Sequence, residues 1–159
     1  MFWRCECMVD KGEQAPNFKL YNDRGEEEEL YNYKGKIIVL YFYPRAMTTG
    51  CTREAVRFNE LLDEFHKHGA VVIGVSTDPV DKIAKFKKKH NLKFTLLSDP
   101  EGKVVKLYGV VKKGTKRLAA ERTTFIIDQD MRIVEVLRNI RPAEKHADLA
   151  LEIVKKLSK

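Results

Sequence analysis

The apolar run at residues 37–43 constrains the fold more than any other feature of this chain. It reads Ile-Ile-Val-Leu-Tyr-Phe-Tyr, and a run without polar alternation is typical of a strand covered on both faces. A second such run lies at 70–75. Between the two runs, apolar residues recur at spacings of three and four: Ala55, Phe58, Leu62 and Phe65. This spacing predicts one amphipathic helix that ends near Gly69, and hence a strand–helix–strand unit.

Further strands and helices are predicted on both sides of this unit. A hairpin is expected over 18–22 and 26–30, with its turn at Gly25. Asp78 and Pro79 predict the cap and first turn of a second helix. The remaining expectations are a strand at 94–97, a helix at 100–108, a basic loop at 112–117, strands at 123–128 and 131–137, and a last helix from Pro142. We therefore predict an α/β domain with a mixed central sheet flanked by helices and an N-terminal β-hairpin extension.

The composition indicates an ordinary soluble protein rather than a nucleic-acid or membrane protein. The 159 residues, 43% of them apolar and 33% charged, suit one domain. The net charge of +7 is dispersed, and its densest clusters, 85–89 and 112–117, are expected to be a solvated helix face and a loop. No apolar run approaches the roughly 20 residues of a membrane span. We expect no nucleic-acid or membrane partner and a cytoplasmic location.

The N-terminus affects how the cysteines are counted. Residues 1–7 are expected to be a flexible tail or a start-site artefact, with a single domain over 8–159, because Met8 would itself make an ordinary start. If translation begins at Met8, Cys51 is the only cysteine. Cys5-x-Cys7 alone is too weak a pattern for a metal site. We predict no metal and no organic cofactor.

Cys51 follows the first apolar run closely and stands at a strand-to-helix turn. The positive end of a helix favours thiolate over thiol there. A lone cysteine is more often a small, inert hydrophobe, but three neighbours argue against that reading. Gly50 leaves the preceding backbone bare, Thr48 can donate its hydroxyl to a thiolate or a substrate oxygen, and Pro44 stiffens the loop and shields one side of the sulfur.

These residues carry a resemblance to a known family. Pro44-x-x-x-Thr48-x-x-Cys51 resembles the active-site motif of the peroxiredoxins, thiol peroxidases with a thioredoxin-like fold. The surrounding residues resemble the branch called bacterioferritin comigratory protein or peroxiredoxin Q. The resemblance extends over nearly the whole chain and includes three further segments: residues 12–18, Ser98-Asp99-Pro100-Glu101-Gly102, and 122–128.

The resemblance implies a role for each residue of the candidate site. Cys51 would be the peroxidatic cysteine, whose thiolate attacks a peroxide and becomes a sulfenic acid. Arg122 would lie beside the sulfur and, together with Thr48 and the Cys51 amide, stabilise the leaving oxygen. Pro44 matches the shielding proline of the family. Glu54 would support the arginine.

Plainer interpretations of Arg122 and Glu54 remain open, and one more residue, His146, also matches the family. Arg122 could form a salt bridge at the sheet edge with Glu121. Glu54 could be an acid in the first turn of its helix, which the helix dipole favours. His146 matches a histidine common in the branch, but its position on the last helix favours a structural role.

The chain departs from the family pattern at position 56. Many members carry a resolving cysteine five residues after the first, and here that residue is Val56; no cysteine occurs after Cys51. Val56 could also replace a natural cysteine. Resolution within the chain would need Cys5 or Cys7, so the better reading is a one-cysteine enzyme.

The expected partners follow from that reading. The substrate would be hydrogen peroxide or a small organic hydroperoxide, and the reductant an external thiol: a thioredoxin-like protein, a glutaredoxin-like protein or a small thiol. The chain could be a monomer or a homodimer. The alternative function is a peroxide sensor or redox-interaction module without efficient turnover. A thioredoxin-type disulfide oxidoreductase is disfavoured because the turn lacks C-x-x-C.

Overall fold

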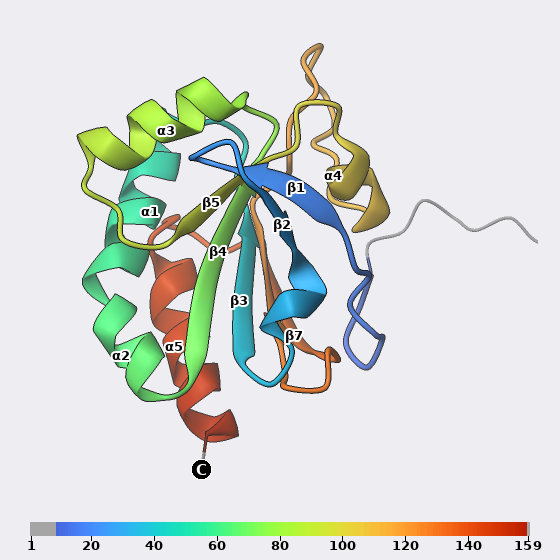
Figure 1. Cartoon of the computed structure of the whole chain (residues 1–159), viewed down its shortest axis with the longest axis vertical. Helices are drawn as coiled ribbons and strands as arrows, with labels where there is room; N and C mark the ends of the chain where they lie inside the picture. The colour runs from blue at the N-terminus through green and yellow to red at the C-terminus, as the bar shows by residue number, and fades with distance from the viewer. Residues whose placement is uncertain (1–8, 159) are drawn as a thin grey trace, which may run out of the picture.

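A computed structural model describes residues 9–158, and within them seven strands form one sheet (Figure 1). The expectations for residues 1–7 lie outside this range. The strands are β1 (Lys19–Asn22), β2 (Glu27–Glu29), β3 (Ile37–Phe42), β4 (Ala70–Ser76), β5 (Thr95–Ser98), β6 (Thr123–Ile127) and β7 (Ile133–Arg138). The helices are η1 (Leu30–Tyr33), a 3-10 turn, and α1 (Thr49–Glu60), α2 (Leu62–Lys67), α3 (Val80–Lys89), α4 (Lys103–Leu107) and α5 (Lys145–Leu157).

The sheet is mixed, as predicted. Its strand order is β2-β1-β5-β4-β3-β6-β7. Strands β3, β4 and β5 run parallel to one another, whereas β6 and β7 on one side and the β1–β2 hairpin on the other are joined by antiparallel pairs. The α/β fold with a mixed central sheet and an N-terminal hairpin extension is therefore confirmed.

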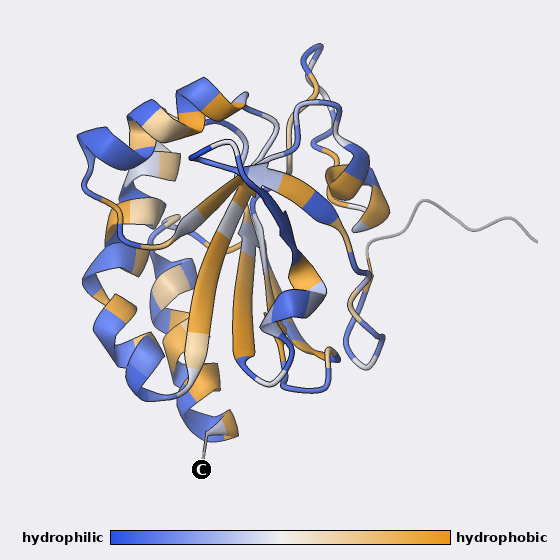
Figure 2. Ribbon diagram, in the orientation of Figure 1, coloured by the Kyte–Doolittle hydropathy of each residue, from blue (hydrophilic) through white to orange (hydrophobic). Residues whose placement is uncertain are grey.

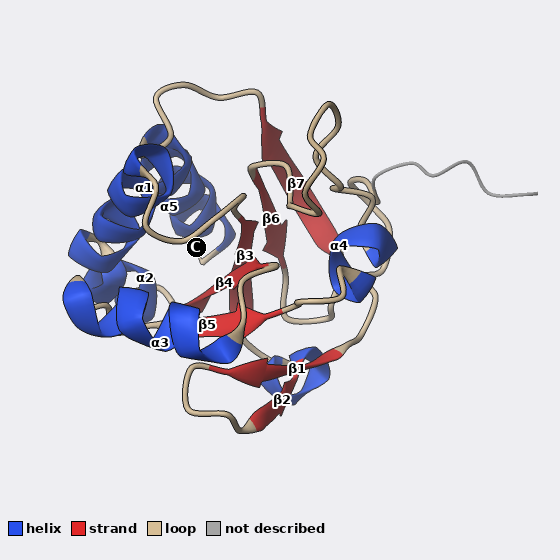
Figure 3. Ribbon diagram, turned by 90° about the horizontal axis from the view of Figure 1, so that it is seen from above, coloured by secondary structure: helices blue, strands red, loops and turns tan. Residues whose placement is uncertain are grey.

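Strand β3 is buried on both faces because two separate sets of elements cover it. Ile37, Val39 and Tyr41 face a core formed with α1, α2, α3 and α5. Ile38 and Leu40, on the opposite face, pack in a second core with α4, η1 and the segment around Phe18. Figure 3 shows the four larger helices on one side of the sheet and α4 on the other. In Figure 2 the hydrophobic colour follows the central strands, and the outer surface of α3 is largely hydrophilic.

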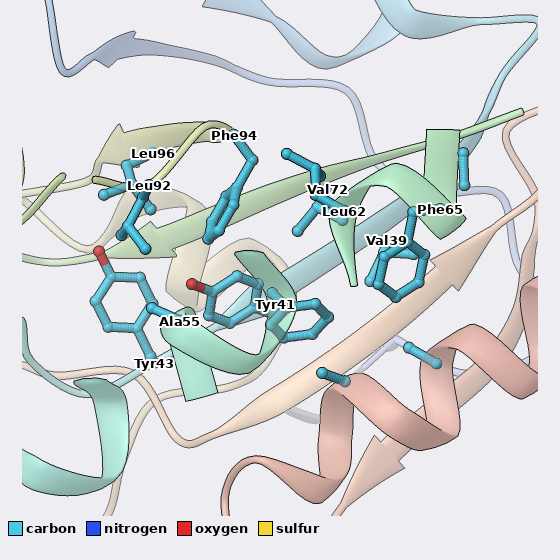
Figure 4. Packing of buried hydrophobic residues seen from close by; sticks show 14 of the residues in the cluster. Val39, Tyr41, Tyr43, Ala55, Leu62, Phe65, Val72, Leu92, Phe94 and Leu96 are labelled. Atoms are coloured by element: carbon cyan, nitrogen blue, oxygen red, sulfur yellow. The ribbon is translucent and has the colours of Figure 1, made fainter. Parts of the chain in front are cut away.

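Aromatic packing fixes the distance between α1 and the sheet. Tyr41 stacks on Phe58 with ring centroids 4.5 Å apart, and Figure 4 shows it beside Tyr43 and Ala55 within this core. The Tyr41 ring lies over Gly74 of β4. A Cβ added at Gly74 would lie 2.9 Å from this ring. A side chain at position 74 would therefore push the ring and α1 away from the sheet.

Three helices differ from their predicted extents, the first being α4, which was expected over 100–108 and spans Lys103–Leu107. The helix predicted up to Gly69 is two helices, because the backbone of Leu61 leaves the helical conformation, with φ −95° and ψ 2°. The apolar face nevertheless continues through α2. The last helix begins at Lys145 rather than Pro142, because the Lys145 amide bonds back only three residues, to the Pro142 carbonyl.

No helix within residues 9–158 is both long enough and apolar enough to cross a membrane.

Candidate active site

The pairing of β3 with β6 determines which distant residue meets Cys51. Phe42 at the end of β3 lies opposite Thr123 at the start of β6. The next residue on each antiparallel strand continues in the same register. Arg122 therefore flanks the point where the chain leaves β3 for the loop that leads to Cys51. The sheet brings together two residues that are far apart in the sequence.

Cys51 is the third residue of α1 and lies within its first turn, in agreement with the predicted strand-to-helix turn. Thr48 is the N-cap, and the first intrahelical bond runs from the Thr52 amide to the Thr48 carbonyl at 2.9 Å. The amides of Thr49, Gly50 and Cys51 therefore precede the ladder of bonds. The first turn contains no acidic residue, so no carboxylate there offsets the positive end of the helix. The Cys51 side chain is only 1% exposed.

Arg122 contacts both Cys51 and Glu54. Its Nη2 donates to Cys51 Sγ at 3.4 Å, and its Nη1 donates to Glu54 Oε1 at 2.6 Å. Glu54 lies one turn after Cys51 on α1, so the same guanidinium spans two residues of one helix face. Gly50 permits this approach, since an added Cβ would lie 3.0 Å from Arg122 Nη2. The alternative salt bridge with Glu121 does not form; Glu121 accepts from Arg138 at 2.8 Å.

The Glu54–Arg122 pair lies in a strongly desolvated part of the site. Glu54 is completely buried, and this burial raises the pKa of its carboxyl to about 8, against the opposing influence of Arg122. Burial alone would lower the pKa of Arg122, but Glu54 and Cys51 outweigh it and raise that pKa. The guanidinium therefore keeps its charge beside the sulfur, while Glu54 can exchange its proton near neutral pH.

His146, which matches a histidine common in the branch and for which the sequence favoured a structural role, also lies with this group of side chains. It is fully buried, with Nδ1 2.9 Å from Thr124 Oγ1 and 3.9 Å from Glu54 Oε2. Burial, reinforced by the charge of Arg122, lowers the pKa of His146 to about 4, so the imidazole is neutral at physiological pH. The available signal was the spacing along α5, which places His146 beside Ala147 and Ala150 on the buried side.

Pro44 and Thr48 border a pocket of about 290 Å³ on one side of Arg122, together with Gly50 and Lys112. The Thr48 hydroxyl donates its proton to the Arg45 carbonyl at 2.9 Å. Among the contacts of the described residues, this is the only hydrogen bond that the hydroxyl makes. Its lone pairs remain free to accept a hydrogen bond from a molecule in the pocket.

Asp78 holds the loop before Cys51, a role that differs from the predicted one. The structure places Pro79 at the cap position of α3 without a side-chain capping bond. The Asp78 carboxylate instead accepts from the Ala46 amide at 2.7 Å and from the Ser76 hydroxyl at 2.9 Å. Because β3 and β4 are parallel, their carboxyl ends meet at one edge of the sheet, which brings Asp78 to this loop.

Within residues 9–158, no group of three or more histidine, cysteine, aspartate or glutamate side chains is arranged to hold a metal ion. The absence of a metal and of an organic cofactor remains a prediction. Val56 lies on α1 and is half-buried. The tail cysteines, Cys5 and Cys7, fall outside the described residues.

Comparisons with known proteins point in one direction. Residues 11–136 match the model of the AhpC/TSA family. Peroxiredoxin Bcp of Bacillus subtilis is 43% identical over 94% of this chain and 98% of its own length, and peroxiredoxin Q, chloroplastic, of Oryza sativa subsp. japonica is 40% identical over 94% and 68%.

Solved structures give the same answer. Peroxidoxin BcpB of Mycobacterium tuberculosis superposes with a TM-score of 0.88 at 36% identity, covering 94% of this chain and 98% of that one. The bacterioferritin comigratory protein of Xanthomonas campestris, described for its alkyl peroxide reduction activity, superposes with a TM-score of 0.83 at 34% identity, covering 89% and 92%.

Proposed function

The chain belongs to the AhpC/TSA family, and on that premise we propose that Cys51 is its peroxidatic cysteine and that an external thiol reduces it after each oxidation. Its named relatives are peroxiredoxins, so the general activity is that of a thiol-dependent peroxidase. The observation that carries the assignment to Cys51 is the 3.4 Å contact between its sulfur and Arg122 at the start of α1.

The proposed chemistry has a balanced first step. The Cys51 thiolate attacks one oxygen of the peroxide, the O–O bond breaks, and Cys51 becomes a sulfenic acid while the peroxide is reduced to water or an alcohol. Negative charge grows on the leaving oxygen, which then takes up a proton. Arg122 and the amides at the start of α1 are fixed donors for that charge and need no reorganisation during the reaction.

Pro44 and Thr48 supply the pocket in which the peroxide would lie. Because the Thr48 hydroxyl already donates to the Arg45 carbonyl, its role here is to accept a hydrogen bond from the peroxide O–H and so orient it. Pro44 limits water at the sulfur. Glu54 holds Arg122 in place through the other terminal nitrogen of its guanidinium. The substrates would be hydrogen peroxide and small organic hydroperoxides.

The second half-reaction needs a reductant. Cys51 is the one cysteine within residues 9–158, so the proposal assigns this step to an external thiol, either a thioredoxin-like or glutaredoxin-like protein or a small thiol. The sensor alternative draws on one observation: Cys51 is only 1% exposed, and a buried sulfenic acid is poorly accessible to a large protein reductant.

Peroxide consumption with excess dithiothreitol tests the proposal. We expect the wild-type chain to turn over repeatedly, Cys51→Ser to lose turnover, and the matched control with Cys5→Ser and Cys7→Ser to keep it. A single oxidation without recycling would favour the sensor. Loss of turnover in the tail variant alone would instead assign resolution to a tail cysteine, and oxidation elsewhere by intact mass would remove Cys51 from its role.

A further inference from the structure

A second and larger pocket lies on the other side of Arg122. It has a volume of about 440 Å³, and we call it the arginine pocket. The residues that matter here are Gly50, Arg53, Arg122, Arg141, Glu144 and His146. It shares Gly50 and Arg122 with the pocket of Pro44 and Thr48, but neither Pro44 nor Thr48 lines it. Two separate cavities therefore meet at the residues next to the Cys51 sulfur.

The charge of the arginine pocket suits an anion. Arg53 and Arg141 are exposed, and in the described part of the chain their side chains make no hydrogen bond or ion pair. Two acidic residues, Glu121 and Glu144, also line the pocket. Glu121 is already paired with Arg138 at 2.8 Å, so Glu144 is the one acidic lining residue that faces the arginines without an ion pair among the described residues. The guanidinium groups of Arg53 and Arg141 are therefore free to bind a ligand, and that of Arg122 lies beside them. Each guanidinium offers a planar pair of N–H donors, which is the geometry that suits a carboxylate best.

His146 supplies a second, independent indication of a ligand. Its ring is fully buried and lines the pocket, yet its Nε2 has no hydrogen-bond partner among the described residues. Thr124 Oγ1 lies 2.9 Å from Nδ1; in the tautomer in which Thr124 donates to Nδ1, the neutral ring carries its proton on Nε2. A buried donor without a partner is costly, and an oxygen of a bound carboxylate would satisfy it. Glu144 Oε1, also buried and unpartnered, would accept from an amino or amide N–H of the same molecule.

We propose that the arginine pocket binds the carboxylate of a small thiol that reduces oxidised Cys51. This inference rests on the proposed function and names the class of its reductant. A thiol is favoured over a carboxylate-bearing hydroperoxide because the pocket of Pro44 and Thr48 already serves the peroxide, whereas the arginine pocket gives the other reactant its own approach to Arg122.

The sulfenic acid of Cys51 is reduced in two steps, each of which consumes one thiol molecule. The thiolate of the bound molecule attacks the sulfur of the Cys51 sulfenic acid, an S–S bond forms, and the hydroxyl leaves with a proton as water. A second thiol molecule then attacks this mixed disulfide, releasing the Cys51 thiol and the symmetrical disulfide of the small thiol. Two thiols are oxidised for each sulfenic acid reduced.

Three thiols of matched length test the charge preference: mercaptopropionate, mercaptoethanol and cysteamine, which are anionic, neutral and cationic at their far ends. The full chain with Cys5→Ser and Cys7→Ser is first oxidised by one equivalent of peroxide, and intact mass verifies sulfenic acid on Cys51. Each thiol is then added at equal thiolate concentration, and the mixed disulfide is followed by mass. We expect mercaptopropionate to react about ten-fold faster than mercaptoethanol, and cysteamine more slowly than both.

Substitution of the pocket then locates the preference. Arg141→Gln and Arg53→Gln should each bring the ratio of mercaptopropionate to mercaptoethanol rates closer to one. Arg24→Gln, an equal change of charge on the hairpin turn between β1 and β2, should leave the ratio unaltered. If Cys51 is oxidised and all three thiols then react at equal rates, this inference fails while the proposed function stands. The same holds if a preference for the anion is seen only with hydroperoxides that carry a carboxylate, and not with the thiols. Failure of Cys51 to form the sulfenic acid would instead overturn the proposed function.

Discussion

Arg122 Nη2 lies 3.4 Å from Cys51 Sγ, while Nη1 of the same guanidinium lies 2.6 Å from Glu54 Oε1. One planar group is thereby held between a candidate nucleophile and a buried carboxyl on the same helix. This arrangement makes Arg122 the residue whose loss should affect the oxidation of Cys51 most directly.

Arg122→Ala should slow oxidation of Cys51 by hydrogen peroxide about a hundred-fold, because it removes a fixed donor from the charge that develops on the leaving oxygen. Rapid-mixing measurement of Cys51 oxidation checks the rate. Arg138→Ala is the control, since it removes an arginine from β7 that pairs with Glu121. Equal slowing in both variants would show that Arg122 has no specific role.

Thr48→Val should slow the same oxidation about ten-fold, because the variant keeps the shape of the side chain but loses the oxygen that would orient the peroxide. Thr48→Ser retains the hydroxyl and should react at a rate close to that of the wild type. Second-order rate constants for the three proteins decide this. If the valine variant reacts as fast as the serine variant, the hydroxyl serves only its bond to the Arg45 carbonyl.

Glu54→Gln should change how stability depends on pH. Burial raises the pKa of Glu54 from 4.5 to about 8, so between these values the folded state binds a proton that the unfolded state has lost. The stability that this proton contributes is fully present below pH 4.5 and is lost as pH rises through about 8. Urea unfolding of both proteins across this range should show the wild type losing stability relative to Glu54→Gln, by on the order of a few kcal/mol.

His146 titrates in the opposite direction and offers an internal check. Its pKa falls from 6.5 to about 4 on folding, so its contribution is lost as pH falls between these values, in wild type and Glu54→Gln alike. The difference between the two proteins therefore isolates Glu54. A difference that stays constant from pH 4.5 to 8 would contradict the raised pKa of Glu54.

Asp78→Ala should destabilise the protein by about 2 kcal/mol and slow peroxide reduction, because the Ala46 amide and the Ser76 hydroxyl lose their buried acceptor. Thermal unfolding and the oxidation rate of Cys51 measure the two effects. Asp81→Ala, an exposed acid in the first turn of α3, is the matched control and should alter stability by less than about 0.5 kcal/mol. A stable variant with slow oxidation would show that the loop depends on Asp78 for geometry alone.

Local patterns predicted the elements well because they depend on spacing within one segment. Each of three segments has its own local signal: the uninterrupted apolar run of β3, the apolar spacing of three and four residues in α1 and α2, and the turn at Gly25. The interruption at Leu61 was not predictable, since the apolar face continues across it and only the backbone conformation changes. The peroxiredoxin motif likewise predicted Cys51 as the nucleophile, and the roles of Cys51, Pro44, Thr48, Arg122 and Glu54 stay predictions.

The sequence by itself determined the order of strands and helices, the turn that presents Cys51, and the lack of any cysteine after it. Only the tertiary structure decided what surrounds that sulfur. The β3–β6 register brings in Arg122, the parallel β3–β4 pair brings Asp78 to the loop, and the packing of α5 buries His146 beside Thr124. These contacts join residues far apart in the chain, and their positions follow from strand pairing and core packing, which no local pattern encodes.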